Sequence, residues 1–200
     1  MNWILEKMYR LLLEMRRARI ARWLCSPQFD RVIHPRGWEP EVIRCLCDTP
    51  WNGPVWDVGA ALGKLAFEVA KHHRVIAFEP NFNMLYYLAS NLKDFDNVLI
   101  VPCALTIDGK PLRGSFDPDF HAAPTGPLAA TISIEEAVAK VGKPGVIKID
   151  IEGGEYELIK SSQLSEFPLL IEWHGPIPKN LPYWDIKDID DTHSLLTPKK

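Results

Sequence analysis

From Trp51 onward, short runs of apolar residues alternate with stretches of helical periodicity. Each run is apolar at almost every position, which is typical of a strand buried on both faces of a parallel sheet. Helices between such strands cover the two faces, and right-handed crossovers then favour a doubly wound, mostly parallel α/β sheet. The predicted strands are Pro54–Ala60, Arg74–Pro80, Asn97–Leu105, Gly145–Glu152 and Pro168–His174.

The intervals between these strands are helical in pattern, with one exception. Helices are predicted over Gly63–His72, Phe82–Leu92, Ser133–Val141 and Glu155–Ser161. The third of them begins at Ser133 and carries Glu136 at the capping-box position. Residues 107–127, rich in Gly, Pro and Asp, are predicted to be irregular, with a short hairpin around Asp108-Gly109.

The two ends of the chain differ from this pattern. Residues 2–24 are predicted to form one amphipathic helix, and residues 1–24 hold six basic and two acidic side chains. Such a helix packs on its own domain or on a second subunit, or it lies on a membrane surface; the sequence leaves these alternatives open. Residues 175–200 contain four prolines and several aspartates, and they are too short for a further helix plus two full strands. We therefore expect a shortened C-terminal end.

Composition narrows the class of protein. With 200 residues, 46% of them hydrophobic, the chain can bury a core and is not disordered. A formal net charge of −3 argues against a general nucleic-acid partner. The four cysteines lack paired Cys-x-x-Cys spacing, and no signal peptide or membrane span is predicted. We expect reduced thiols and a cytoplasmic protein, peripheral at the membrane if the first helix lies there.

Two features at the ends of the first two strands suggest a ligand site. In an open α/β sheet, ligands bind beyond the carboxyl ends of the strands, where strand order reverses. The first strand leaves through Asp57-Val58-Gly59-Ala60-Ala61-Leu62-Gly63, which is not the Gly-x-Gly-x-x-Gly fingerprint. Glu79 ends the second strand, 20 residues after Gly59, where an acid accepts hydrogen bonds from ribose hydroxyls. Together they indicate a nucleoside ligand, with NAD and S-adenosylmethionine both open.

The fourth and fifth strands end in ionisable residues. Lys148, Asp150 and Glu152 alternate with isoleucines, so that period two places them on one face. Glu172 and His174 repeat this spacing on the next strand. Unpaired ions on apolar strands are costly, so these groups are either paired or used. Asp150 and Glu152 are expected to position a substrate or cofactor, with Glu172 or His174 as general base. A rim ion pair of Lys148 and a divalent metal are the alternatives, although no spacing demands a metal.

Several motifs occur in order from about Gly37 to His174. Their segments are Gly37-Trp38-Glu39-Pro40, Val55–Gly63, Ala77-Phe78-Glu79-Pro80, Asn91, Lys148–Glu155 (KIDIEGGE) and Ile171-Glu172. In this set the sequence resembles the FkbM family of S-adenosylmethionine-dependent methyltransferases, and KIDIEGGE is the most specific match. Ala61 stands where the family usually has Asn, and Phe82 where it usually has Pro.

The resemblance implies a class I methyltransferase, Rossmann-like fold and methyl transfer to a hydroxyl of a sugar, glycan or secondary metabolite. It divides the chain into an N-terminal helix and linker (1–36), a cofactor-binding domain (37–176) and a Pro/Asp-rich tail (177–200). The usual closing helix and strand pair are expected to be missing, which leaves the substrate side open or completed by another subunit. An inactive binding module is the alternative function, and a nicotinamide oxidoreductase is disfavoured by the missing glycine.

The resemblance also assigns roles to residues. S-adenosylmethionine is the expected cofactor, with its ribose on Glu79 and its adenine beside residues 102–105. Proton removal from the acceptor hydroxyl is expected from Asp150, Glu172 or His174, and substrate contacts from Lys148 and Glu152. The predicted cofactor-binding residues are Asp57, Gly59, Ala60, Gly63, Glu79, Pro80, Cys103 and Ala104.

Overall fold

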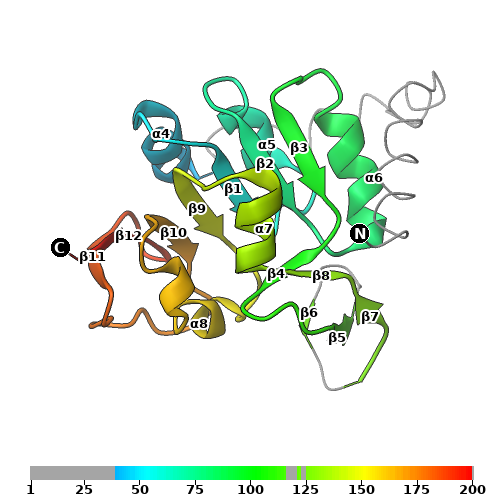
Figure 1. Ribbon diagram of the computed structural model, residues 1–200. Helices are drawn as coiled ribbons and strands as arrows, with labels where there is room; N and C mark the ends of the chain where they lie inside the picture. The colour runs from blue at the N-terminus through cyan, green and yellow to red at the C-terminus, as the bar shows by residue number, and fades with distance from the viewer. Residues whose placement is uncertain (1–38, 116–120, 123–124, 200) are drawn as a thin grey trace.

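The computed structural model describes residues 39–115, 121–122 and 125–199 (Figure 1). The predicted N-terminal helix over residues 2–24, with its membrane or subunit contact, lies outside these ranges. None of the helices in the described ranges is long and apolar enough to cross a bilayer.

A seven-stranded sheet forms the centre of the structure, in the order β11-β12-β10-β9-β1-β2-β3 (Figure 1). The strands β3, β2, β1, β9 and β10 run parallel to one another, β12 is antiparallel to β10, and β11 is antiparallel to β12. Strand order reverses between β1 and β9, as the doubly wound prediction requires. The bounds are β1 Val55–Val58, β2 Val75–Phe78, β3 Val98–Val101, β9 Val146–Ile149, β10 Leu169–Glu172, β11 Trp184–Asp188 and β12 His193–Pro198.

Helices cover both faces of this sheet and create two hydrophobic cores. The helices α4, α5 and α6 pack on one face, and α7, α8 and the 3-10 helix η1 lie on the other. Ser133 and Glu136 form the predicted capping box at the start of α7. The helices are α4 Pro40–Asp48, α5 Lys64–Val69, α6 Phe82–Asn91, α7 Ile134–Val141, α8 Glu155–Leu158 and η1 Ser162–Leu164.

Because side chains alternate between the two faces of a strand, two charged residues lie on the face of the sheet that α4, α5 and α6 cover. Val55 of β1 and Val146 of β9 belong to the core on that side. Two positions further along, Asp57 and Lys148 are partners in the β1–β9 register, and both are buried. The sequence pattern therefore leads to a buried acid and a buried base side by side in the middle of the sheet.

The C-terminal prediction was wrong in one respect. Residues 184–198 form two full strands, so the sheet is closed by the strand pair that we expected to be missing. Pro176, Pro178 and Pro182 lie in the connection before β11, and Pro198 ends β12, so they do not interrupt pairing. Leu196 and His193 of β12 are buried against the sheet. No helix lies between β10 and β11 in this described stretch.

The region after β3 also differs from expectation. The predicted third strand is divided at Pro102 into β3 and β4 (Ala104–Thr106), because β4 pairs with β8 (Thr131–Ser133) in a separate sheet. The hairpin predicted around Asp108-Gly109 does not form, since β5 pairs with β6 and β7 instead of β4. The sheet of β5, β6 and β7 lies at one end of the molecule (Figure 1). Its strands are β5 Leu112–Ser115, β6 His121–Ala122 and β7 Leu128–Ala129.

Candidate functional site

The loop after β1 passes very close to the end of β9. Gly59 has φ of 89°, and a Cβ added there would lie 1.8 Å from the carbonyl oxygen of Asp150. Gly63 has φ of 81°, and its Cβ would lie 2.6 Å from Cδ1 of Leu88 in α6. Only glycine fits either position without displacement of its neighbours. The turn after β1 and its close packing on α6 therefore require glycine at these two positions.

Ala61, between the two glycines, has φ of 45°, in the left-handed region that a non-glycine residue rarely adopts. Asn tolerates this region better than Ala does, which gives a physical reason for the Asn usual at this position in the resembling family. The end of the loop is held by Asn91, whose Nδ2 donates to the carbonyl oxygen of Leu62 at 2.7 Å.

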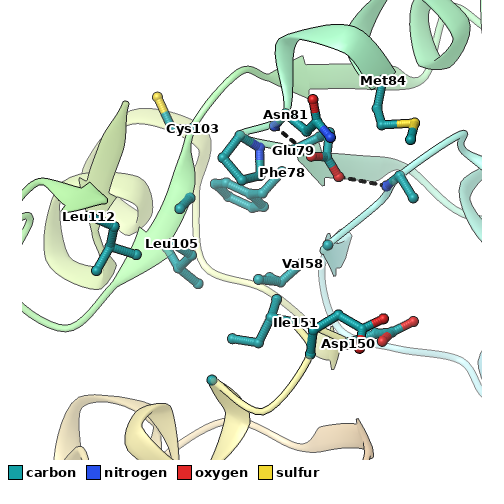
Figure 2. A pocket seen from close by; sticks show the side chains of 16 residues that line it. Val58, Phe78, Glu79, Asn81, Met84, Cys103, Leu105, Leu112, Asp150 and Ile151 are labelled. Atoms are coloured by element: carbon teal, nitrogen blue, oxygen red, sulfur yellow. Dashed lines mark hydrogen bonds between the residues drawn. The ribbon is translucent and has the colours of Figure 1, made fainter. Parts of the chain in front are cut away.

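Glu79 joins the loop after β1 to the loop after β2. Its side chain is buried, and Oε2 accepts a hydrogen bond from the backbone N–H of Ala61 at 2.7 Å while Oε1 accepts from that of Asn81 at 2.6 Å (Figure 2). This structural role was not apparent from the sequence. A carboxylate offers about four acceptor positions, so hydrogen bonds from ligand hydroxyls are chemically compatible with these two bonds. The ribose contact stays a prediction.

A pocket of about 790 Å³ opens beside Glu79, at the ends of β1, β2 and β9. Its walls are mainly apolar, with side chains such as Phe78, Leu105 and Ile151 around it (Figure 2). A mainly apolar lining with a few polar groups is typical of sites for small molecules and cofactors. The lining includes several predicted site residues: Gly59, Glu79, Pro80, Cys103, Ala104, Asp150 and Glu152.

A second pocket of about 670 Å³ adjoins the first and shares Gly59, Ala61, Met84 and Asp150 with it. Of the other predicted residues, Asp57, Ala60 and Lys148 line this second pocket. Gly63, Glu172 and His174 line neither of the two.

Cys103 is fully buried in the wall of the first pocket. Burial raises the pKa of its thiol to about 11. The side chain is therefore a neutral thiol at physiological pH and contributes packing and shape instead of charge.

Three ionisable residues meet at the rim of the first pocket, and we call Asp150, Glu152 and His174 the rim cluster. His174 Nε2 lies 3.6 Å from Asp150 Oδ1 and 3.5 Å from Glu152 Oε2. Their proximity was predicted from the spacing, although β9 ends at Ile149 and Glu152 sits in a left-handed turn with φ of 53°. Glu155 holds the backbone of His174 in place, because its Oε1 accepts a hydrogen bond from the backbone N–H of His174 at 3.0 Å.

A second group lies deeper, and we call Glu39, Glu172 and His193 the interior cluster. His193 Nε2 is 3.5 Å from Glu172 Oε2 and 3.8 Å from Glu39 Oε2. Lys148 connects the two clusters, since its Nζ lies 3.1 Å from Asp150 and 3.5 Å from Glu172. Glu39 and His193 were not identified from the sequence as site candidates. The spacing Asp190-x-x-His193, a short turn before a strand, was the signal available.

Burial and charge give these carboxyl groups different proton affinities. Burial raises the pKa of Asp57 to about 7, although Lys148 lowers it. Burial also raises the pKa of Asp150, against the opposing effect of Lys148. Contact with His193 lowers the pKa of Glu172 to about 2. Asp150 is therefore the better proton acceptor near neutral pH, and Glu172 is a permanent anion.

Comparisons with known proteins agree with the sequence motifs. A family model described as the methyltransferase FkbM domain matches residues 57–196. The hexuronic acid methyltransferase AglP of Haloferax volcanii is 33% identical over 141 residues, which are 65% of this chain and 58% of that protein. The chain thus matches AglP over less than two thirds of that relative's length.

Solved structures with a similar fold are more distant. The precorrin-6Y C5,15-methyltransferase of Geobacter metallireducens GS-15 is 18% identical, with a TM-score of 0.42 over 67% of this chain and 60% of that one. Aeropyrum pernix fibrillarin, in complex with natively bound S-adenosyl-L-methionine, is 11% identical, with a TM-score of 0.46 over 78% of this chain and 72% of that one. The strand order of this chain itself shows the fold.

Proposed function

This chain belongs to the FkbM methyltransferase domain family, and on that premise we propose that it transfers a methyl group from S-adenosylmethionine to a hydroxyl of a sugar-containing acceptor. The fold is the Rossmann-like class I methyltransferase fold. The observation that carries the proposal is the pocket where strand order reverses, closed on one side by the buried carboxylate of Glu79.

The residues around this pocket fit the cofactor. The loop at Gly59 has no Cβ that would fill the space beside Asp150, and Glu79 presents a carboxylate at the end of β2, where an acid binds ribose hydroxyls. Phe78, Cys103 and Leu105 supply an apolar wall suited to a planar base. S-adenosylmethionine, when bound, supplies a methyl group on a positively charged sulfur. Glu79 would hold its sugar, and the backbone around Gly59 and Ala60 would shape the methionine side.

Proton removal from the acceptor is assigned to Asp150. It lines both pockets, and burial raises its pKa toward the range in which a base works at neutral pH. The Asp150 carboxylate would accept the proton of the acceptor hydroxyl. A bound sulfonium cofactor would supply the methyl group to that oxygen as its carbon–sulfur bond breaks, and would leave as a neutral thioether. His174, which lines neither pocket, is assigned the role of positioning Asp150. Glu172 is assigned to holding Lys148 instead of the general-base role considered from sequence.

The acceptor class is proposed from the relative whose printed name is hexuronic acid methyltransferase. Glycans with terminal hexuronic acids are therefore the first acceptors to test. A product that gains the mass of one CH₂ unit and keeps it in mild alkali carries an ether at a hydroxyl. A product that loses the added mass in alkali carries a methyl ester at the carboxyl group and refutes the hydroxyl assignment.

Cofactor binding is tested separately from turnover. Calorimetry with S-adenosylmethionine should give saturable binding to the whole chain, and Glu79→Ala should remove it. Asp185→Asn, a change at an exposed carboxylate of β11, serves as the matched control. Because Glu79 also ties two loops together, thermal unfolding of Glu79→Ala must show that the variant is folded. An absence of binding by the wild-type chain would favour the inactive binding module.

A further inference from the structure

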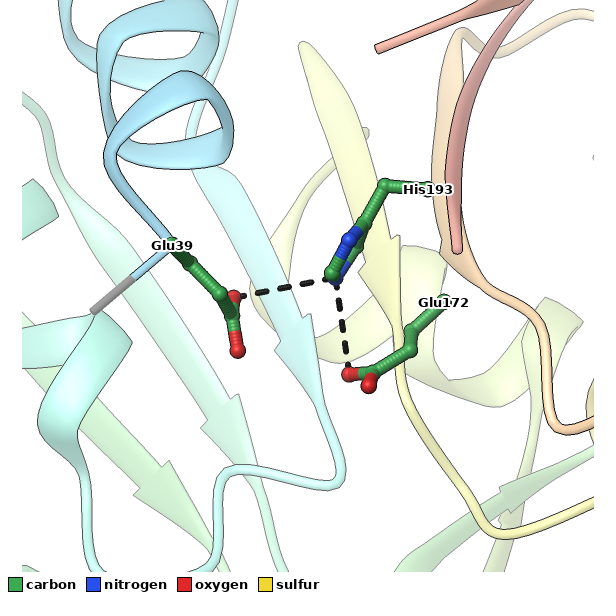
Figure 3. A group of neighbouring side chains, drawn as sticks. All are labelled: Glu39, Glu172 and His193. Atoms are coloured by element: carbon green, nitrogen blue, oxygen red, sulfur yellow. Dashed lines mark ion pairs between the residues drawn. The ribbon is translucent and has the colours of Figure 1, made fainter. Parts of the chain in front are cut away.

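Three donor atoms of the interior cluster converge on one point between α4, β10 and β12 (Figure 3). Glu39 precedes α4, Glu172 ends β10 and His193 begins β12. One oxygen from each carboxylate and the Nε2 atom of the imidazole all lie within 4.8 Å of one another. The cluster lies apart from the two pockets, whose linings do not include any of its members.

The distances between these atoms are longer than those of hydrogen-bond partners and close to the spacing of ligands that share a metal ion. The Nε2 of His193 is 3.5 Å from one carboxylate oxygen and 3.8 Å from the other, whereas N–H···O bonds measure about 2.7–3.2 Å. Metal bonds of about 2.0–2.2 Å place neighbouring tetrahedral ligand atoms about 3.3–3.6 Å apart. The space at the centre therefore suits an ion.

Two of the three donors have no hydrogen-bond partner among the described residues. His193 is 3% exposed, and its Nε2 is one of these buried, unpartnered atoms; Oε2 of Glu39 is the other. Glu39 stands at the N-cap of α4 but makes no side-chain cap bond there. Buried polar atoms are nearly always satisfied, so two orphans directed at the same point indicate a missing partner.

Asp190 orients the imidazole as an outer carboxylate orients a metal-bound histidine. Its Oδ1 lies 2.9 Å from His193 Nδ1 and also accepts from the backbone N–H groups of Thr192 and His193. A carboxylate only accepts hydrogen bonds, so Nδ1 carries the proton. The lone pair of Nε2 then points at the two glutamates. Histidines that bind a metal usually donate their other ring N–H to a carboxylate in this way.

We propose that Glu39, Glu172 and His193 bind a divalent first-row transition ion such as Zn²⁺ or Mn²⁺, with Asp190 positioning the histidine. Imidazole and carboxylate donors together suit such ions. The ion would fasten the start of α4 to β10 and β12. The Nζ atom of Lys148 lies 3.5 Å from the same Glu172 oxygen and opposes a second positive charge, so this lysine is expected to weaken ion binding.

A proton is the natural competitor of the ion. Burial lowers the pKa of His193, but Glu172 and Asp190 outweigh this effect and the pKa is raised. Without a metal, a proton on Nε2 pairs the imidazole with the neighbouring carboxylates. Metal binding must release that proton, so affinity should fall as the pH is lowered.

The experiment is calorimetric titration of the full chain, stripped with a chelator, with Zn²⁺ and with Mn²⁺. The expected result is one ion per chain, with binding weakened at least about 100-fold by His193→Gln and about 10–100-fold by Asp190→Asn. His72→Gln is the matched control, because it removes an exposed histidine far from any role in the cluster and should leave affinity unchanged.

Two results would overturn the proposal: no binding of either ion by the wild-type chain, or equal binding by the wild type and His193→Gln. The first would leave the cluster as a histidine–carboxylate ion pair, and the second would move the ion elsewhere, for instance to the rim cluster. If circular dichroism shows that His193→Gln is unfolded, Glu39→Gln carries the same test. Its side chain is more exposed and makes no cap bond. Cofactor binding plays no part in either readout.

Discussion

The rim cluster and the interior cluster contain the same kinds of side chain, yet they face different surroundings. Asp150 and Glu152 of the rim cluster line the first pocket and are partly open to solvent. His193 of the interior cluster is buried and its partners line neither pocket. Lys148 touches one carboxylate of each. Access to a ligand, not residue type, therefore separates groups suited to proton transfer from groups suited to holding the fold together.

The physical consequence appears in the carboxyl groups on the two sides of Lys148. Burial raises the pKa of Asp150, which faces the pocket, whereas His193 lowers that of Glu172 to about 2. A carboxylate that binds its proton weakly is a poor general base but a good permanent anion. Two acids joined to one lysine can thus serve different functions, and substitutions at each should separate these functions.

The largest effect is expected for Lys148→Met, because it removes the cation that both clusters share. The variant would leave Asp57, Asp150 and Glu172 without their buried counter-charge, at a cost of about 3–5 kcal/mol in the free energy of unfolding. Urea unfolding at pH 8 would measure this loss.

The double variant Lys148→Met/Asp57→Asn tests the cause. It removes one of the uncompensated carboxylates and should recover part of the lost stability, a coupling that a double-mutant cycle would report. If the two changes are simply additive, Lys148 does not neutralise Asp57.

Asp150→Asn should distinguish the roles of the two clusters, because it should abolish methyl transfer while the chain stays folded. Removal of a general base costs about 10²–10⁴-fold in rate. Binding of S-adenosylmethionine should persist, since the proposed cofactor contacts lie at Glu79 and around Gly59. Methyl transfer measured beside calorimetry gives the comparison.

Asp185→Asn is again the matched control, because its carboxylate is exposed on β11. Near-normal turnover by Asp150→Asn would show that Asp150 is not the general base. The rim cluster would then have to work through His174, and His174→Gln would become the decisive variant.

The sequence predicted most of the sheet because its strands are apolar at nearly every position, a pattern that few other structures produce. It also placed Gly59, Glu79 and Asp150 together, since parallel strands end at the same edge of a sheet. The prediction for residues 175–200 was wrong because their prolines and aspartates suggested a tail without a strand pair. Those prolines fall between strands or at a strand end, so pairing with β10 was possible after all.

What could not be predicted depends on contacts between distant parts of the chain. Glu39 and His193 are separated by most of the sequence and meet only because β12 inserts between β10 and β11. Alternation along β10 likewise placed Glu172 with His174. The structure divides them, because Glu172 faces Lys148 and His193 whereas His174 lies beyond the strand end and faces Asp150.

Asp57→Asn tests how the buried carboxyl groups differ in proton affinity, because it should change the pH dependence of the free energy of unfolding. The pKa of Asp57 is raised to about 7, so the native chain holds this proton more tightly than the unfolded chain does. Native stability is therefore lost as the pH rises from about 4 to 7, and the variant avoids that loss. The gain in unfolding free energy should be on the order of 2 kcal/mol larger at pH 8 than at pH 5. An equal gain at both pH values would contradict the raised pKa.

The smallest effect is expected at Ala61, which carries backbone strain at the pocket and has no counterpart in the interior of the sheet. Its φ of 45° is poorly suited to Ala, and Asn accepts this conformation at a lower cost, so Ala61→Asn should stabilise the chain by up to about 1 kcal/mol. Ala61→Val, with a β-branched side chain in the same conformation, should destabilise it. Both variants keep the backbone N–H that donates to Glu79. Thermal unfolding of the pair therefore isolates the strain, and a shift of the same sign in both would show that φ at this position does not limit stability.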